Sequence, residues 1–165
     1  QGAAEVVGID KHDYRLEKSI SLGATKSMKF TSLENLIQQT EDITNGELFD
    51  IVVDASGNKD GFNICLNLLK PQGKFITFSI VTEDMVEFEH SLMLRKNLDI
   101  HATQIATTPL PIDEIRELVS LAERGWWDPK SLKTHVSDLS DLQNCYEDYT
   151  DQKNKVIKNV ARFNP

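Results

Sequence analysis

One carboxylate, Asp10, stands directly after the short apolar run "EVVGI" (residues 5–9), where a buried strand would end. In open parallel sheets, ligands bind at the carboxyl ends of the strands. A carboxylate there can accept two hydrogen bonds from a ribose diol, and it repels the 2′-phosphate of NADP. Aspartate also starts turns and caps helices, and composition alone favours a cap for the helix expected over residues 11–22. The residue by itself leaves both interpretations open.

Three more apolar runs end in short segments of small or polar residues, which are "DASGN" (54–58), "FSIVT" (78–82) and "TQIATT" (103–108). If the sheet is doubly wound, the carboxyl ends of its strands form one crevice. We therefore expect these segments to line a single ligand crevice with Asp10 at its rim.

Strand and helix patterns alternate along the chain. Apolar runs predict strands at residues 5–9, 26–30, 49–56, 74–80, 98–105, 133–137 and 157–163. Amphipathic segments predict helices at residues 11–22, 31–42, 59–70, 89–96, 111–125 and 139–149. Thr31 with Glu34 forms a capping-box pattern, and "FDIVVDAS" (49–56) is continuous enough to be buried on both faces. The alternation predicts one α/β domain whose mostly parallel sheet is covered on both faces.

The bulk composition excludes some partners. The chain has 165 residues and a formal net charge of -8, which argues against binding to nucleic acid or to anionic membrane surfaces. No window approaches the roughly 20 apolar residues that a membrane helix needs. The two cysteines, Cys65 and Cys145, are too few for a disulfide scaffold and lack metal-ligand spacing. A reducing cytoplasm is the simplest setting for them.

Longer segments carry a family resemblance. "GAAEVVGIDKHDYRLEKSISLGAT" (2–25) resembles the second strand and following helix of the medium-chain, zinc-type alcohol and polyol dehydrogenases. "FDIVVDASGNKDGFNICLNLLKPQGKFITFSI" (49–80) is similar to the fourth and fifth strands of that family. "LDIHATQI" (98–105), "GWWDPKSLKTHVSDLSDL" (125–142) and "NKVIKNVARF" (154–163) are similar to its later segments. The resemblance covers essentially the whole chain in order and spacing.

The resemblance implies ten residues that would contact NAD, which are Asp10, Arg15, Ala55, Ser56, Gly57, Ser79, Ile80, Gln104, Ile105 and Lys158. The first two would hold the adenosine ribose, and the last would meet the pyrophosphate. Small residues at 55–57 would line the adenine side, and backbone groups at 79–80 and 104–105 would face the nicotinamide. For Arg15, an exposed helix charge without a ligand remains the alternative.

The resemblance also shows what this sequence lacks. A dinucleotide-binding fingerprint needs G-x-G-x-x-G between a strand and a helix, and none of the eight glycines is arranged that way. In the family the fingerprint precedes the segment matched by residues 2–10, and a zinc-bearing catalytic domain precedes that. We therefore expect residues 1–165 to be a partial Rossmann-type domain, N-terminally truncated. It would lack the first strand and the Gly-rich turn of the family's 3-2-1-4-5-6 sheet.

As an expectation, the parent protein is a zinc-dependent dehydrogenase that oxidises a secondary alcohol or polyol to a ketone, with hydride transfer to NAD. Zinc would be held by the missing N-terminal half, and no catalytic or metal-binding residue is assigned here, so this chain alone would not be competent. The resemblance implies a homodimer formed through the strand at 98–105. The alternative is a non-catalytic module that binds a nucleotide or a protein. Asp10 argues against a zinc-independent, NADP-preferring reductase of the same superfamily.

Overall fold

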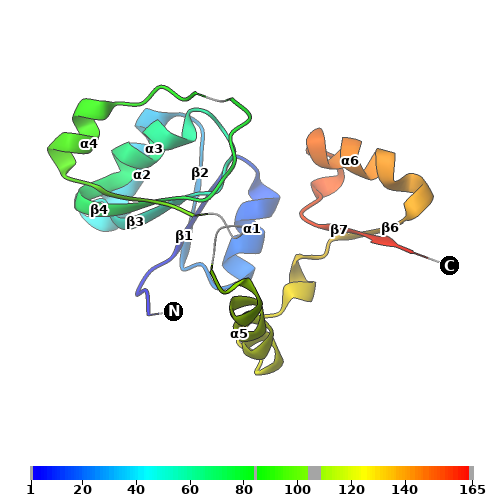
Figure 1. Ribbon diagram of the computed structural model, residues 1–165. Helices are drawn as coiled ribbons and strands as arrows, with labels where there is room; N and C mark the ends of the chain where they lie inside the picture. The colour runs from blue at the N-terminus through cyan, green and yellow to red at the C-terminus, as the bar shows by residue number, and fades with distance from the viewer. Residues whose placement is uncertain (1, 84, 104–108, 164–165) are drawn as a thin grey trace. The chain divides into compact units, whose positions relative to one another are not determined.

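The computed structural model describes residues 2–83, 85–103 and 109–163 (Figure 1). The chain divides into two compact units, residues 1–107 and 108–165. None of the helices in these described ranges is long and apolar enough to cross a membrane. The elements of the first unit are β1 (Val7–Asp10), α1 (Asp13–Ser21), β2 (Lys26–Lys29), α2 (Leu33–Thr44), β3 (Phe49–Asp54), α3 (Gly61–Leu68), β4 (Leu69–Thr77), α4 (His90–Lys96) and β5 (Asp99–Ala102).

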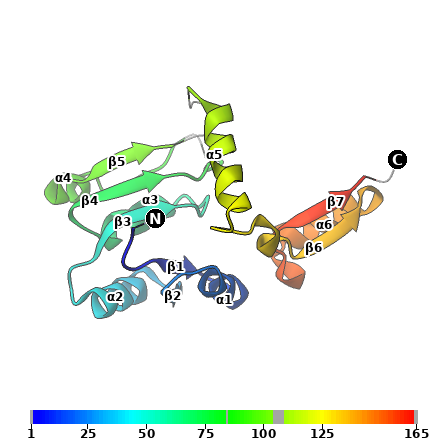
Figure 2. The ribbon, with the colours of Figure 1, turned by 90° about the horizontal axis from the view of Figure 1, so that it is seen from below.

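All strand pairs of the first unit are parallel. One sheet consists of β1 and β2, and the other has the order β3-β4-β5 (Figure 2). Within the described part of this unit, no strand pairs with the second edge of β1 or of β3. In the expected order 3-2-1-4-5-6, strands 3-2 lie on one side of strand 1 and strands 4-5-6 on the other. The observed orders β2-β1 and β3-β4-β5 match these two groups. The prediction of an α/β fold with a parallel sheet is confirmed.

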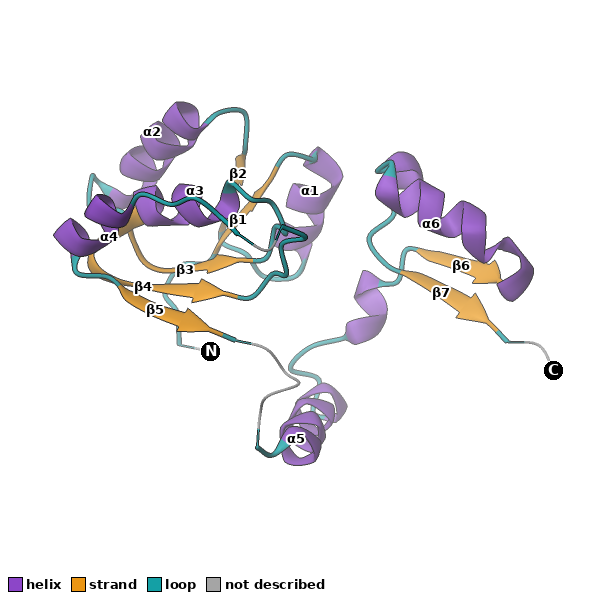
Figure 3. Ribbon diagram, turned by 45° about the horizontal axis from the view of Figure 1, so that its top comes forward, coloured by secondary structure: helices purple, strands orange, loops and turns teal. Residues whose placement is uncertain are grey.

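The core of the first unit lies between the sheets and their helices. Helices α3 and α4 lie over the same face of the β3–β5 sheet (Figure 3). The most buried side chains of this cluster are Leu36, Leu66, Leu68, Leu69 and Phe75. Burial of apolar side chains of this size contributes roughly 1.5–3 kcal/mol each. This packing fixes α3, and therefore the loop that leads into it from β3.

Strand β3 corrects the expectation that residues 49–56 are buried on both faces. Val52 is 9% exposed and joins the core, whereas Ile51 and Val53 are 57% and 54% exposed. Successive side chains of a strand point to opposite faces, and in the first unit the described helices α3 and α4 cover only the Val52 face. Burial therefore alternates over residues 51–54, and β3 ends with a buried residue, Asp54.

The bounds of three further elements differ from the predictions. The N-cap of α2 is Ser32 rather than Thr31, because the Ser32 side chain accepts the backbone N–H of Asn35 at 3.2 Å. The predicted helix at 59–70 is shorter, since α3 begins at Gly61 and β4 already begins at Leu69. The strand predicted at 98–105 is described as β5 over Asp99–Ala102, and residues 104 and 105 lie outside the described residues.

The second unit is smaller and also α/β. Its elements are α5 (Pro111–Glu123), β6 (His135–Asp138), α6 (Leu142–Thr150), β7 (Asn159–Arg162) and three short 3-10 turns at Pro129–Leu132, Leu139–Asp141 and Lys153–Lys155. Strands β6 and β7 form a parallel pair, and α6 packs on β6. Helix α5 begins with a proline in its first turn, where the missing N–H costs nothing.

Candidate functional site

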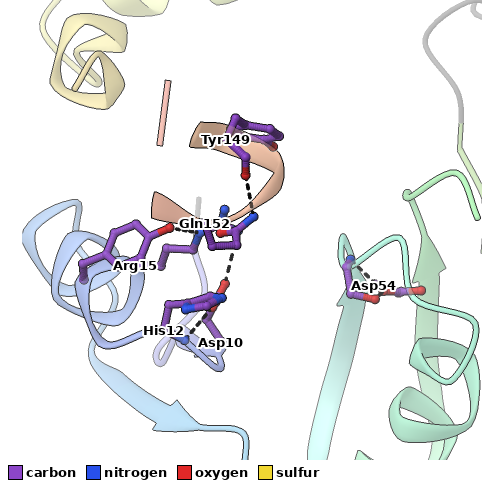
Figure 4. A network of polar contacts seen from close by, with 8 residues as sticks. Asp10, His12, Arg15, Asp54, Tyr149 and Gln152 are labelled. Atoms are coloured by element: carbon purple, nitrogen blue, oxygen red, sulfur yellow. Dashed lines mark hydrogen bonds and ion pairs between the residues drawn. The ribbon is translucent and has the colours of Figure 1, made fainter. Parts of the chain in front are cut away.

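Asp10 is the last residue of β1, and the two oxygens of its carboxylate have different neighbours (Figure 4). Oδ1 accepts the backbone N–H of His12 at 2.9 Å, and Oδ2 lies 3.7 Å from Nη1 of Arg15. The Asp10 side chain is 27% exposed. The N-cap position of α1 is His12, which makes no side-chain cap bond, so the interpretation of Asp10 as the helix cap is wrong. The carboxylate instead closes a turn before the helix.

Arg15 is positioned beside Asp10 by the first turns of α1. Its Nε donates to the hydroxyl of Tyr14 at 3.2 Å, and its side chain is 30% exposed. The structure therefore brings Asp10 and Arg15 together, and Arg15 is not an isolated exposed charge. An ionised carboxylate offers about four lone-pair sites, of which the His12 N–H uses one. The other lone-pair sites of this carboxylate can accept hydrogen bonds from donors such as the hydroxyls of a diol.

The loop after β3 is built around a second acid, Asp54. Its Oδ1 accepts both the N–H of Ser56 at 2.9 Å and the hydroxyl of Ser56 at 2.7 Å. Figure 4 shows this carboxylate at the end of β3. Asp54 lies in the segment 54–58 that the sequence predicts to line the crevice, but the sequence pattern indicates no separate role for it. The signal was present, because an acid at the end of an apolar strand is also what singled out Asp10.

The loop after β4 lies against the loop after β3. The N–H groups of Phe78 and Ser79 both donate to the peptide oxygen of Asp54 at 3.0 Å. A Cβ on Gly57, whose φ is +66°, would lie 3.4 Å from the peptide oxygen of Ile80. Of the predicted site residues, the segments 55–57 and 79–80 are therefore brought together at the carboxyl ends of two neighbouring strands.

Other predicted residues are not placed with this group. Gln104 and Ile105 lie outside the described residues. Lys158 belongs to the second unit, where it precedes β7. The hydroxyl of Thr134 accepts the N–H groups of Ile157 and Lys158 at 3.0 and 3.3 Å, which fixes the backbone at this point. The Lys158 side chain is exposed.

The described residues offer no donor set for a metal ion. No group of three or more His, Cys, Asp or Glu side chains in residues 2–83, 85–103 and 109–163 is arranged to hold one. Cys65 is buried, and burial, followed by the nearby charge of Asp54, raises the pKa of its thiol to about 12. A thiol with so high a pKa is a poor nucleophile and a poor metal ligand at neutral pH.

Comparisons with solved structures support the fold. A zinc-dependent alcohol dehydrogenase 2 from Streptococcus pneumonia has a TM-score of 0.86 and 23% identity, over 98% of this chain and 45% of that one. A protein described as a short chain alcohol dehydrogenase from Escherichia coli CFT073, complexed with NADH, has a TM-score of 0.78 and 20% identity, over 97% of this chain and 45% of that one. At these identities the likeness shows a Rossmann-like fold.

Comparisons of sequence go further. An alcohol dehydrogenase from Cupriavidus necator is 26% identical over 157 residues, which are 95% of this chain and 42% of that protein. An L-threonine 3-dehydrogenase from Alteromonas mediterranea is 33% identical over 149 residues, or 88% of this chain and 41% of that protein. The chain thus spans less than half the length of these relatives. The family model "Zinc-binding dehydrogenase" matches residues 1–124. The chain belongs to the zinc-binding dehydrogenase family.

Proposed function

We propose that this chain is the NAD-binding part of a zinc-dependent medium-chain dehydrogenase that oxidises a secondary alcohol or polyol to a ketone. The observation that carries the proposal is the carboxylate of Asp10 at the end of β1. It is partly exposed, it accepts the backbone N–H of His12 through one oxygen, and Arg15 lies beside the other oxygen. A carboxylate in this position selects an unphosphorylated ribose, because a 2′-phosphate would bring like charges together.

In this proposal each predicted residue has one task. Asp10 accepts the hydroxyls of the adenosine ribose, and Arg15 lies at the same sugar. Segments 55–57 and 79–80 present backbone groups along the cofactor, and their contact through Gly57 and Ile80 supports a shared surface. Gln104 and Ile105 would complete the nicotinamide end, and Lys158 the pyrophosphate end. When bound, NAD accepts the hydride, while these residues bind and orient it.

Zinc does not fit the residues described here. Since no group of donors for a metal ion occurs in the described ranges, we derive no catalytic step through zinc in this chain. The proposal places the metal, the proton transfer and the choice of alcohol in a part of the parent protein outside this sequence.

We further propose a homodimer formed through the strand at 98–105, in a cytoplasmic protein. In the described part of the chain, β5 pairs with β4 along one edge and with no strand along the other. An unpaired strand edge favours pairing with a second copy around a two-fold axis. The two cysteines are free, which suits a reducing compartment.

The test is a titration of the chain with NADH and, in parallel, with NADPH. We expect NADH to bind more tightly, and Asp10→Ala to weaken NADH binding by about 10- to 150-fold, since hydrogen bonds to a charged group contribute about 1.5–3 kcal/mol. The same variant should narrow the preference for NADH over NADPH. Asp13→Ala is the matched control, because Asp13 is 68% exposed and pairs with Lys29 at 2.7 Å.

Two results would count against the proposal. An unchanged ratio of NADH to NADPH affinity in Asp10→Ala would show that this carboxylate does not meet the ribose. Absence of binding of both dinucleotides would show that residues 1–165 do not form an NAD site by themselves.

A further inference from the structure

Asp54 is the one charged residue that is buried among the residues the structure describes, with 5% of its surface exposed. We propose that Asp54 is a positioning residue for the cofactor site, which anchors the loop after β3 through its carboxylate and the loop after β4 through its peptide oxygen. The identity of the ligand rests on the proposed function. The anchoring itself rests only on the contacts within the first unit.

The carboxylate begins a relay of hydrogen bonds that runs from β3 to α3. Oδ1 of Asp54 accepts the N–H and the hydroxyl of Ser56. The Ser56 hydroxyl in turn accepts the N–H of Asn58 at 3.1 Å, and the Asn58 side chain accepts the N–H of Asp60 at 2.9 Å. Each of these bonds joins residues two positions apart, so the position of the Asp54 carboxylate determines the conformation of the whole loop. This fixes residues 55–57, the segment proposed to line the adenine side.

The peptide oxygen of the same residue holds the second loop. It accepts the N–H groups of both Phe78 and Ser79 at 3.0 Å, directly after β4 ends. Gly57 also lies close to this loop, because a Cβ on Gly57 would be 3.4 Å from the peptide oxygen of Ile80, which is an ordinary van der Waals distance. Two loops that share a ligand surface thus share one anchor. A displacement of about 1 Å in such a surface is enough to weaken binding and catalysis strongly.

The carboxylate of Asp54 lies near the start of helix α3. None of the ion pairs among the described residues involves Asp54. Its oxygens lie 2.9 and 3.0 Å from the position of a Cβ on Gly61, the first residue of α3, so the carboxylate lies against the start of that helix. Helix N-termini stabilise negative charge, and a buried carboxylate needs every hydrogen bond it has. Removing the charge should therefore loosen the relay.

The deciding experiment is NMR-detected amide hydrogen exchange on the 165-residue chain and its variant Asp54→Asn, which keeps the size of the side chain. We expect the Ser56 amide to exchange about tenfold faster, because a charge-assisted bond becomes a neutral one. The amides of Phe78 and Ser79 should change by less than about threefold, since their acceptor is a peptide oxygen that the variant keeps.

A second variant and a control sharpen this test. Ser56→Ala removes the hydroxyl that accepts the Asn58 N–H, so Asn58 should lose protection while Ser56 keeps its bond to the carboxylate. Asp50→Asn is the matched control, because Asp50 lies on the same strand with 79% of its side chain exposed and pairs with Lys70. It should leave the exchange at Ser56 unchanged.

The outcomes separate a positioning role from a general structural one. An unchanged rate at Ser56, or an equal acceleration along the core of β3 at Val52 and Val53, would overturn the proposal. In the dinucleotide titration, Asp54→Asn should raise the Kd for NADH and NADPH by the same factor, because it loosens the loop after β3 but leaves Asp10 in place. A change in their ratio would also contradict it.

The two proposals fail differently. If Asp10→Ala leaves the ratio of NADH to NADPH affinity unchanged while Ser56 exchange accelerates in Asp54→Asn, the proposed cofactor is wrong and the anchoring of the loops stands. If Asp10→Ala behaves as expected and exchange at Ser56 does not change in Asp54→Asn, the anchoring is wrong and the proposed function stands.

Discussion

Replacing Gly61 by alanine would place a methyl group inside the polar cluster at the end of β3. A Cβ at this position lies 2.6 Å from the Ser56 hydroxyl oxygen, which must therefore move. That hydroxyl makes one bond to the charged Asp54 and accepts one from Asn58. Such bonds contribute about 1.5–3 and 0.5–1.5 kcal/mol, whereas alanine gains at most about 1 kcal/mol over glycine in a helix. We expect Gly61→Ala to lower the free energy of unfolding by about 1–3 kcal/mol.

The assay is urea denaturation followed by circular dichroism, on the wild-type chain, Gly61→Ala, Ser56→Ala and the double variant. In the Ser56→Ala background the nearest obstructing atom is absent and only the Asp54 oxygens at 2.9 and 3.0 Å remain, so the same methyl group should cost less, by about 1 kcal/mol. Two results would refute the reasoning. One is a Gly61→Ala variant as stable as the wild type, and the other is an equal cost of Gly61→Ala in both backgrounds.

Two predictions concern α3 and its surroundings. Since the pKa of Cys65 is raised from 9.0 to about 12, only about one molecule in a thousand carries its thiolate at pH 9. Iodoacetamide should therefore label Cys145 and spare Cys65 in the folded chain, and peptide mapping that finds equal labelling would contradict this. The Lys96 ammonium donates to three backbone carbonyls at 2.6–3.0 Å near the end of α3. Lys96→Met should lower the free energy of unfolding by about 2 kcal/mol in urea, and Arg95→Met, at an exposed neighbour, by much less.

The order and type of the elements followed from hydrophobic periodicity, but several boundaries did not. Thr31 and Ser32 are adjacent residues that both cap helices well, and only the backbone conformation decides that Ser32 accepts the Asn35 N–H. The end of α3 was misplaced because β4 begins at Leu69, where it pairs with Phe49 of β3. That pairing joins residues distant in the chain, and local propensity carries no information about it.

The candidate site was predictable in part. The position of Asp10 at the end of a strand indicated a ligand crevice, but the contact with Arg15 depends on a turn between strand and helix that spacing does not fix. The sequence pattern predicts no role for Asp54, although the two-residue period of a strand indicates which face its side chain occupies. Val52 and Asp54 are two residues apart and so face the same side, and Val52 is in the core.

In the roles proposed above, the same residue type serves opposite purposes at the ends of β1 and β3. A carboxylate that binds a ligand must stay hydrated until the ligand arrives, and Asp10 keeps 27% of its side chain exposed. A carboxylate that holds a loop makes its bonds within the protein, and Asp54 is 5% exposed, with its Oδ1 accepting both the N–H and the hydroxyl of Ser56. If this distinction is correct, substitutions at Asp10 change which dinucleotide is chosen, and substitutions at Asp54 change how tightly both are held.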